Sequence, residues 1–260
     1  MGNDSWYLPE NLEAQEEREI AAAARGSINP DNDFPSYYAY LKGINKDHIK
    51  KHILFGGVQA AAYAQVLERA LSRKGLALRG NVLDLGCAIG TITEALRALH
   101  ASNQATGIDI SQSAIAAAKI ENPRCAFLRQ SADNLDAVPD ASVDVIHARE
   151  FYPFTRTSDQ EYQLKYLRLF HGKLKPGGLV VLQSRELPHG IEVTISQRKP
   201  EIAAMGFNIV GVEQIMGFKS ARLYRLIPLT PVYLLLTTLE KYGRRLKRAP
   251  QNNLYILAKR

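Results

Sequence analysis

The chain has 260 residues, of which 46% are apolar and 23% are charged, a balance typical of an ordinary globular protein. A chain of this length forms one large domain, or a domain with an attached cap, and needs no disulfide or metal staple to fold. Its two cysteines, Cys87 and Cys125, are too few for a disulfide framework or a four-ligand zinc site, which fits a reducing compartment.

The first 79 residues predict helices joined by loops. Residues 10–25 are rich in Glu and Ala, and residues 52–73 carry apolar residues near the spacing of a helix face, with a turn-rich break at residues 26–35. Residues 1–26 lack the basic and apolar regions of a secretory signal, and no run reaches the ~20 apolar residues of a membrane span. We therefore expect an N-terminal helical cap over residues 1–79 and a cytoplasmic location.

Beyond the cap, short apolar runs alternate with helical stretches. Strands are expected at residues 82–85, 105–110, 125–128, 143–147, 179–183, 207–212 and 254–258. Helices are expected at residues 91–100, 111–120, 159–174 and 192–205. Continuous apolar strands separated by helices are typical of parallel strands covered on both faces. The prediction is an open α/β sheet, in which ligands bind outside the carboxyl ends of the strands.

The first expected strand runs directly into a glycine turn, in the sequence VLDLGCAIGT. Gly86 and Gly90 allow the backbone to turn tightly and to approach a ligand closely. The second strand ends in Asp109, within GIDIS, where a carboxylate can accept hydrogen bonds from two vicinal ribose hydroxyls. The glycine spacing is not the G-x-G-x-x-G of dinucleotide binders, and Asp84 inside the first strand would repel a pyrophosphate. A cationic ligand is therefore favoured over NAD.

The segments VLDLGCAIG, GIDIS, QSADNL, VDVIHARE and LKPGGLVVLQ resemble, in order and spacing, the class I S-adenosylmethionine-dependent methyltransferases. The likeness covers residues 80–217 and the terminal strand. It implies an α/β, Rossmann-like seven-stranded sheet with helices on both faces, whose last strand inserts antiparallel beside the sixth. It also implies S-adenosylmethionine as cofactor and a methyltransferase domain over residues 80–260, with a basic insertion at residues 218–250 before the last strand.

The resemblance assigns the residues that line the cofactor: Asp84, Gly86, Cys87, Gly90, Asp109, Ile110, Ser131, Ala132, Asp133 and His147. In that assignment the glycine turn and Asp84 lie against the methionine part, and Asp109 binds the ribose. Ala88 replaces the usual middle glycine of the turn. The family often has Asp-Ala-Glu at the adenine turn, where this chain has Ser131-Ala132-Asp133. No metal site is predicted.

Methyl transfer by in-line displacement needs mainly alignment of the nucleophile at ~3 Å, and a hydroxyl acceptor gains a further ~10²–10⁴ in rate from a general base. His147 and Glu150, which follow the fourth strand, are the first two candidate bases, and His189 after the fifth strand is the third. The alternative for His147 is a packing or backbone-bonding role, and Glu150 could instead pair with Arg149. Oxygen, nitrogen and carbon acceptors all stay open.

The net charge of the basic insertion is +7, equal to that of the whole protein, because it contains eight basic residues and a single acidic one, Glu240. The eight are Lys219, Arg222, Arg225, Lys241, Arg244, Arg245, Lys247 and Arg248. An apolar run too short to span a bilayer precedes the last five. This composition indicates either a solvated helix face or contact with a membrane or lipid-linked substrate, with an anionic substrate as a further alternative. Nucleic acid is disfavoured because few aromatic residues interleave with the basic ones.

The predicted function is S-adenosylmethionine-dependent methyl transfer to a small-molecule, glycan or lipid-linked acceptor. Two alternatives are a catalytically inactive S-adenosylmethionine-binding module and an NAD-dependent oxidoreductase. The predicted location is the cytoplasm, with peripheral contact at the inner face of a membrane, through residues 218–250, as an alternative.

Overall fold

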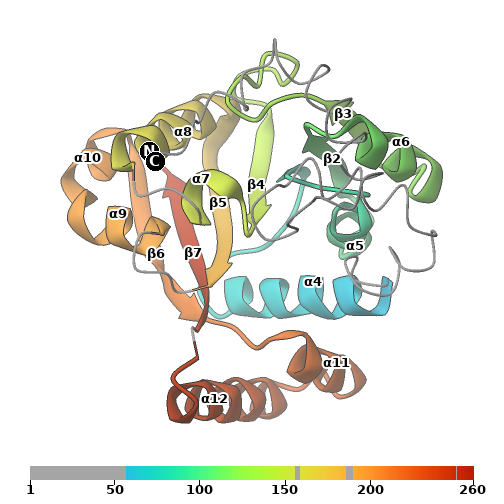
Figure 1. The fold of residues 1–260 in the computed structure, drawn as a ribbon, viewed down its shortest axis with the longest axis vertical. Helices are drawn as coiled ribbons and strands as arrows, with labels where there is room; N and C mark the ends of the chain where they lie inside the picture. Colours follow the sequence, from blue (N-terminus) through green and yellow to red (C-terminus); the bar gives the residue numbers. More distant parts are fainter. Residues whose placement is uncertain (1–56, 156–158, 186–189, 250) are drawn as a thin grey trace, which may run out of the picture.

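In the computed structural model, the chain is described over residues 57–155, 159–185, 190–249 and 251–260. Seven strands form one sheet in the order β3-β2-β1-β4-β5-β7-β6 (Figure 1). The strands are β1 Asn81–Leu85, β2 Gln104–Asp109, β3 Ala126–Arg129, β4 Val143–Arg149, β5 Leu174–Arg185, β6 Phe207–Gln214 and β7 Asn252–Lys259. The first five run parallel, and β7 is antiparallel to both of its neighbours. The predicted seven-stranded sheet with an antiparallel last strand beside the sixth is confirmed.

The helices cover both faces of this sheet. They are α4 Gly57–Ser72, α5 Thr91–Ala98, α6 Gln112–Glu121, α7 Tyr152–Thr155, α8 Gln160–Lys173, α9 Ile191–Gln197, α10 Lys199–Ala204, α11 Phe218–Leu226 and α12 Thr230–Leu246. Successive side chains of a strand point to opposite faces, so Val145 and Ile146 belong to two different apolar clusters. Buried side chains of α8, α9 and α10 belong to the cluster that includes Ile146. Buried side chains of α4, α5 and α11 belong to the cluster that includes Val145.

The insertion at residues 218–250 consists of α11 and α12. Helix α11 packs on α4, and α12 packs on α11, so that the pair forms an outer layer beyond α4 (Figure 1). Within the described part of the chain, no helix combines the length and apolar character that crossing a membrane would require.

Some predicted boundaries are wrong. The single helix expected over residues 192–205 is two helices, because the chain leaves helical geometry at Arg198 and Pro200 opens the second helix. The strand expected at residues 179–183 begins earlier, at Leu174, and its pairing with β4 shifts register between Val143 and Val145. Most of the cap predicted over residues 1–79, including the helix at residues 10–25, lies outside the described residues. Helix α4 forms where the second helix of that cap was expected.

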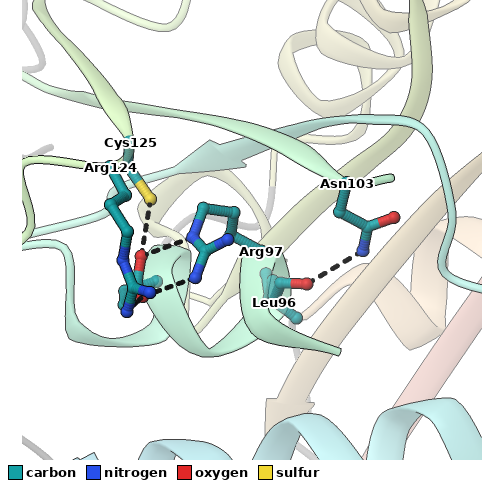
Figure 2. Close-up of polar contacts among 6 residues, drawn as sticks. Leu96, Arg97, Asn103, Arg124 and Cys125 are labelled. Atoms are coloured by element: carbon teal, nitrogen blue, oxygen red, sulfur yellow. Dashed lines mark hydrogen bonds and ion pairs between the residues drawn. The ribbon is translucent and has the colours of Figure 1, made fainter. Parts of the chain in front are cut away.

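Polar contacts at both ends fix α5, the helix that follows the glycine turn. Glu94 accepts hydrogen bonds from Arg97 at 2.7 and 2.8 Å, from Arg124 at 2.6 Å and from the thiol of Cys125 at 3.3 Å (Figure 2). Asn103 donates to a carbonyl in the last turn of the helix at 2.9 Å (Figure 2). The helix is therefore tied to the loops on either side of it, and this fixes the start of the helix against the turn.

The turn itself tolerates no side chain at Gly90. Its φ is 76°, and a Cβ placed there would lie 2.4 Å from Cζ of Phe127. We expect Gly90→Ala to lower the free energy of unfolding by about 2–4 kcal/mol, measured by urea denaturation, because left-handed backbone strain and overpacking add together. The matched control is Gly172→Ala in α8, where no atom lies within 4 Å. It should raise stability by about 0.5–1 kcal/mol, and equal effects of the two substitutions would contradict this packing.

Candidate functional site

The glycine turn between β1 and α5 is built from residues with positive φ. Gly86, Ala88 and Gly90 have φ values of 69°, 50° and 76°. The backbone N–H groups of Gly86 and Cys87 both donate to the carbonyl of Ile108 in β2, at 2.8 and 3.0 Å. Ala88 adopts the left-handed conformation that the family's glycine would reach without strain. The turn is therefore held against the end of β2, beside Asp109.

Asp109 joins this turn to the start of α6. Its Oδ2 accepts the N–H of Ala88 at 2.8 Å, and its Oδ1 accepts the N–H of Ser111, the N-cap of α6, at 2.9 Å. Burial raises the pKa of the Asp109 carboxyl to about 6, although these N–H groups lower it in part. An ionised carboxyl can accept about four hydrogen bonds, so the carboxylate of Asp109 keeps capacity for a further donor.

A second acid, Asp84, lies in a buried polar chain that links three elements. In the register of β1 and β4, Asp84 stands opposite His147. Its Oδ1 accepts the Nδ1–H of His147 at 2.7 Å, and its Oδ2 accepts the hydroxyl of Thr93, from α5, at 2.6 Å. The other ring nitrogen of His147 lies 2.9 Å from the hydroxyl of Tyr63, from α4. Asp84 and His147 are almost completely removed from solvent.

The contact with Asp84 fixes the donor at one ring nitrogen of His147. A carboxylate only accepts, so Nδ1 donates its proton to Asp84, while Nε2 and the hydroxyl of Tyr63 share the second hydrogen bond. Burial raises the pKa of Tyr63 far above its usual range, although the guanidinium of Arg149, 5.7 Å from the ring centre, opposes the shift. Both nitrogens of His147 are therefore engaged within the protein. Catalysis by His147, and contact of Asp84 or His147 with a ligand, stay predictions.

The turn after β3 contains a buried acceptor. Ser131 and Ala132 are buried, and Oδ1 of Asp133 is removed from solvent without a hydrogen-bond donor among the described residues. A buried acceptor without a donor is unfavourable, and a ligand N–H group at this position would remove that cost. The turn where adenine was expected thus offers an oxygen suited to an amino group.

Glu150 follows β4 in a backbone conformation that is uncommon for its residue type, with a φ of 47°. Its N–H donates to the carbonyl of Gln183 in β5 at 2.8 Å, and the amide of Gln183 reaches its carboxylate at 3.5 Å. The next residue, Phe151, lies against the glycine turn, 3.4 Å from where a Cβ of Gly86 would stand. Glu150 is thus held at the carboxyl ends of the strands, where the glycine turn also lies. His189, the third candidate base, lies outside the described residues.

Both cysteines are free, and Cys87 is buried inside the glycine turn. Burial raises the pKa of both thiols, that of Cys125 to about 12 with a further contribution from the neighbouring Glu94. At neutral pH both are uncharged and therefore poor nucleophiles. Within the described residues, no group of three or more His, Cys, Asp or Glu side chains is arranged to hold a metal ion.

The structure brings the glycine turn and Asp109 together at the carboxyl ends of β1 and β2, and it joins His147 to Asp84 through neighbouring strands. Sequence reasoning missed Tyr63 and Thr93. Tyr63 is the single aromatic residue in the alanine-rich sequence of α4, and this contrast was the available signal. Thr93 lies in the first turn of the helix after the glycine motif, where a hydroxyl can face the preceding strand.

Part of the chain is similar to known methyltransferases. A family model described as "Methyltransferase domain" matches residues 82–178, from β1 into β5. The trans-aconitate 2-methyltransferase of Delftia acidovorans (strain DSM 14801 / SPH-1) is 34% identical over 114 residues, which are 44% of this chain and 41% of that protein. The alignment thus spans less than half of the relative's length.

Solved structures share the fold at low identity. The plantazolicin methyltransferase BamL is 13% identical, with a TM-score of 0.52, over 95% of this chain and 99% of its own. An S-adenosylmethionine-dependent methyltransferase from Mesorhizobium loti is 18% identical, with a TM-score of 0.50, over 75% of this chain and 98% of its own. At these identities the likeness shows the fold alone, which is the Rossmann-like methyltransferase fold.

The buried chain of contacts around His147 makes a prediction for stability. His147→Ala leaves the carboxylate of Asp84 and the hydroxyl of Tyr63 buried without their shared partner. We expect the free energy of unfolding, measured in urea, to fall by about 3–5 kcal/mol. The control is His100→Ala, which removes a half-buried contact to Glu68 at 3.1 Å and should cost less than about 1 kcal/mol. Equal losses in the two variants would show that the Asp84 contact contributes little.

Proposed function

We propose that this chain, whose residues 82–178 form a class I S-adenosylmethionine-dependent methyltransferase domain, transfers a methyl group from S-adenosylmethionine to a small-molecule acceptor. A glycan or a lipid-linked molecule is a further candidate acceptor. The observation that carries the proposal is the position of Asp109, whose buried carboxylate lies beside the glycine turn and keeps capacity for a further hydrogen-bond donor.

The residues at the sheet edge fit the donor molecule in two independent places. The two vicinal ribose hydroxyls are donors that the carboxylate of Asp109 can accept. The exocyclic amino group of adenine matches the unpaired oxygen of Asp133. The methionine part would follow the backbone of the glycine turn, since Gly86 and Gly90 present no side chain there. A dinucleotide fits less well, because the buried Asp84 carboxylate next to the turn would repel a pyrophosphate.

Methyl transfer requires mainly that the protein align the acceptor atom with the methyl group of the donor. The sulfonium of S-adenosylmethionine supplies an activated methyl group, and an aligned nucleophile displaces the neutral thioether. We assign Glu150 as the group that accepts a proton from a hydroxyl acceptor, because it stands at the end of β4 next to the turn. We assign His147 a positioning role, since both of its nitrogens are engaged within the protein, one by Asp84 and the other by Tyr63.

The acceptor class is supported by the name of the relative. That protein is named for methyl transfer to trans-aconitate, and the match extends over 114 residues of this chain. We also propose that residues 1–79 cap the site. The support is α4, the helix in the described part of this cap. Its Tyr63 forms a hydrogen bond with His147 of β4.

The test is turnover, measured as release of S-adenosylhomocysteine with a panel of carboxylate, hydroxyl and amine acceptors that includes trans-aconitate. Transfer of a methyl group to any acceptor in the panel supports the proposed methyltransferase activity. The alternative, a module that keeps the pocket without chemistry, predicts that the protein binds S-adenosylmethionine but releases no S-adenosylhomocysteine with any acceptor. The absence of binding to the unmodified protein would contradict both.

If Glu150 accepts the proton, its substitution should affect acceptors differently, according to whether they must lose a proton. Glu150→Gln should reduce turnover of a hydroxyl acceptor by about 10²–10⁴ because the proton loses its acceptor. A carboxylate acceptor is already ionised, so its turnover should change little. Steady-state rates with one acceptor of each kind, at saturating donor, measure the difference. Equal losses for both acceptors would show that Glu150 positions residues rather than moves a proton.

Asp109 makes a prediction for donor affinity. Asp109→Ala should weaken binding of S-adenosylmethionine by about tenfold to several hundredfold, because two charge-assisted hydrogen bonds of ~1.5–3 kcal/mol are removed, partly offset by water. Calorimetric titration measures both proteins. The pKa of Asp109 is about 6 in the free protein and the ionised form binds the diol, so the affinity of the unmodified protein should fall as the pH drops from 7 to 5.

The matched control is Asp109→Asn, which keeps the size of the side chain and cannot titrate. Its weaker affinity should be nearly independent of pH over the same range. A parallel fall in the unmodified protein and in Asp109→Asn would assign the pH dependence to another group. Normal affinity in Asp109→Ala would remove the ribose assignment.

A further inference from the structure

The outer side of α12 is apolar although it faces solvent. Nine of the twelve large apolar side chains that are exposed in the described part of the chain lie within residues 223–246. On α12 they are Leu234, Leu235, Leu239, Tyr242 and Leu246, with exposed fractions between 43% and 69%. At 3.6 residues per turn, these five positions share one side of the helix, which we name the outer face.

The opposite side of α12 is packed against the rest of the protein. Tyr233 is fully buried, packs against the ring of Tyr224 at 5.5 Å and carries the guanidinium of Arg73 at 5.7 Å from its ring centre. An ordinary surface helix buries its apolar side and presents polar residues to water. Helix α12 buries one side and still exposes leucines on the other. The helix itself lies beyond α4, away from the sheet (Figure 1).

A cluster of positive charge borders the outer face. Glu240, the single acid of residues 218–250, is turned inward, where it accepts the N–H of Gly217 at 2.7 Å and Nε of Arg244 at 2.9 Å. The exposed residues Arg245, Lys247 and Arg248 surround Leu246 at the end of the helix. Exposed leucines beside an uncompensated cationic cluster are the chemistry of a helix that lies in a membrane interface.

We propose that the outer face of α12 docks on an anionic lipid surface, with the leucines in the interfacial region and Arg245, Lys247 and Arg248 against the headgroups. Charge favours this occupant over a second copy of the chain, because the same face of a second copy would bring no free carboxylate to the cluster: Glu240, the single acid of residues 218–250, already binds Gly217 and Arg244. The apolar side chains select it over nucleic acid, which would use the basic residues and leave the leucines in water.

The experiment is sedimentation of the full chain with vesicles, either of phosphatidylcholine alone or of equal parts phosphatidylcholine and phosphatidylglycerol. We expect binding to the anionic vesicles, weakening at high salt, and little binding to phosphatidylcholine alone. The measurement uses neither donor nor acceptor, so its failure would leave the proposed methyl transfer untouched.

Two sets of variants separate charge from apolar contact. Arg245→Glu/Lys247→Glu/Arg248→Glu should weaken binding by at least about a hundredfold, because each lost positive charge accounts for about fivefold. The matched control reverses three exposed lysines on other helices, Lys119, Lys165 and Lys199, and has the same net charge. It should retain most of the binding.

The apolar set is Leu235→Ser/Leu239→Ser/Leu246→Ser, which should weaken binding by at least about tenfold. Its matched control is Val58→Ser/Ile120→Ser/Val212→Ser, which removes three large apolar side chains that are exposed elsewhere in the described residues and should bind as the unmodified protein does. Thermal melting checks that each variant folds, and the single substitution Leu239→Ser replaces the triple variant if that one melts early.

Each other outcome overturns the proposal. Equal binding of the charge-reversed variant and its control would exclude the cationic cluster. A dimer in the absence of vesicles that the serine variant dissociates would assign the outer face to a second copy. Salt-sensitive binding to single-stranded RNA, lost on charge reversal and kept in the serine variant, together with no vesicle binding, would assign the cluster to nucleic acid.

Discussion

The carboxylate of Asp109 is the constraint on which the candidate site depends. By accepting the N–H groups of Ala88 and Ser111, it locks the turn after β1 to the helix start after β2. The left-handed conformation of Ala88 and the packing of Phe127 against Gly90 persist because this contact and the N–H bonds to Ile108 hold the turn in place. Burial keeps the pKa of Asp109 near 6, so a ligand that donates hydrogen bonds to it also stabilises its charge.

Much of the sheet could be predicted from the sequence because parallel strands buried on both faces leave continuous apolar runs, as at residues 179–182 of β5. The boundaries were harder. The break between α9 and α10 left a local signal, because Pro200 has no N–H for a helical hydrogen bond and fits only the first turn of a helix, and the prediction of one helix over residues 192–205 overlooked it. The start of β5 at Leu174 depends on pairing with Val143, a partner distant in the sequence.

The site shows the same division. Local motifs predicted the glycine turn and Asp109, because a bend between a strand and a helix requires glycine. They did not predict that Asp84 would face His147, since this depends on the register between β1 and β4, or that Tyr63 would reach the same histidine from α4. The cationic charge of residues 218–250 was visible in the composition. The separation of buried Tyr233 from exposed Leu239 on α12 required the packed structure.

The most direct measurement is the number of protons released when S-adenosylhomocysteine binds at pH 6, obtained by calorimetry in two buffers of different ionisation enthalpy. With a pKa of about 6, Asp109 is about half protonated in the free protein, and a bound diol would ionise it. The account predicts release of about half a proton, which disappears in Asp109→Asn. Tight binding with no proton release, or with the same release in both proteins, would contradict it.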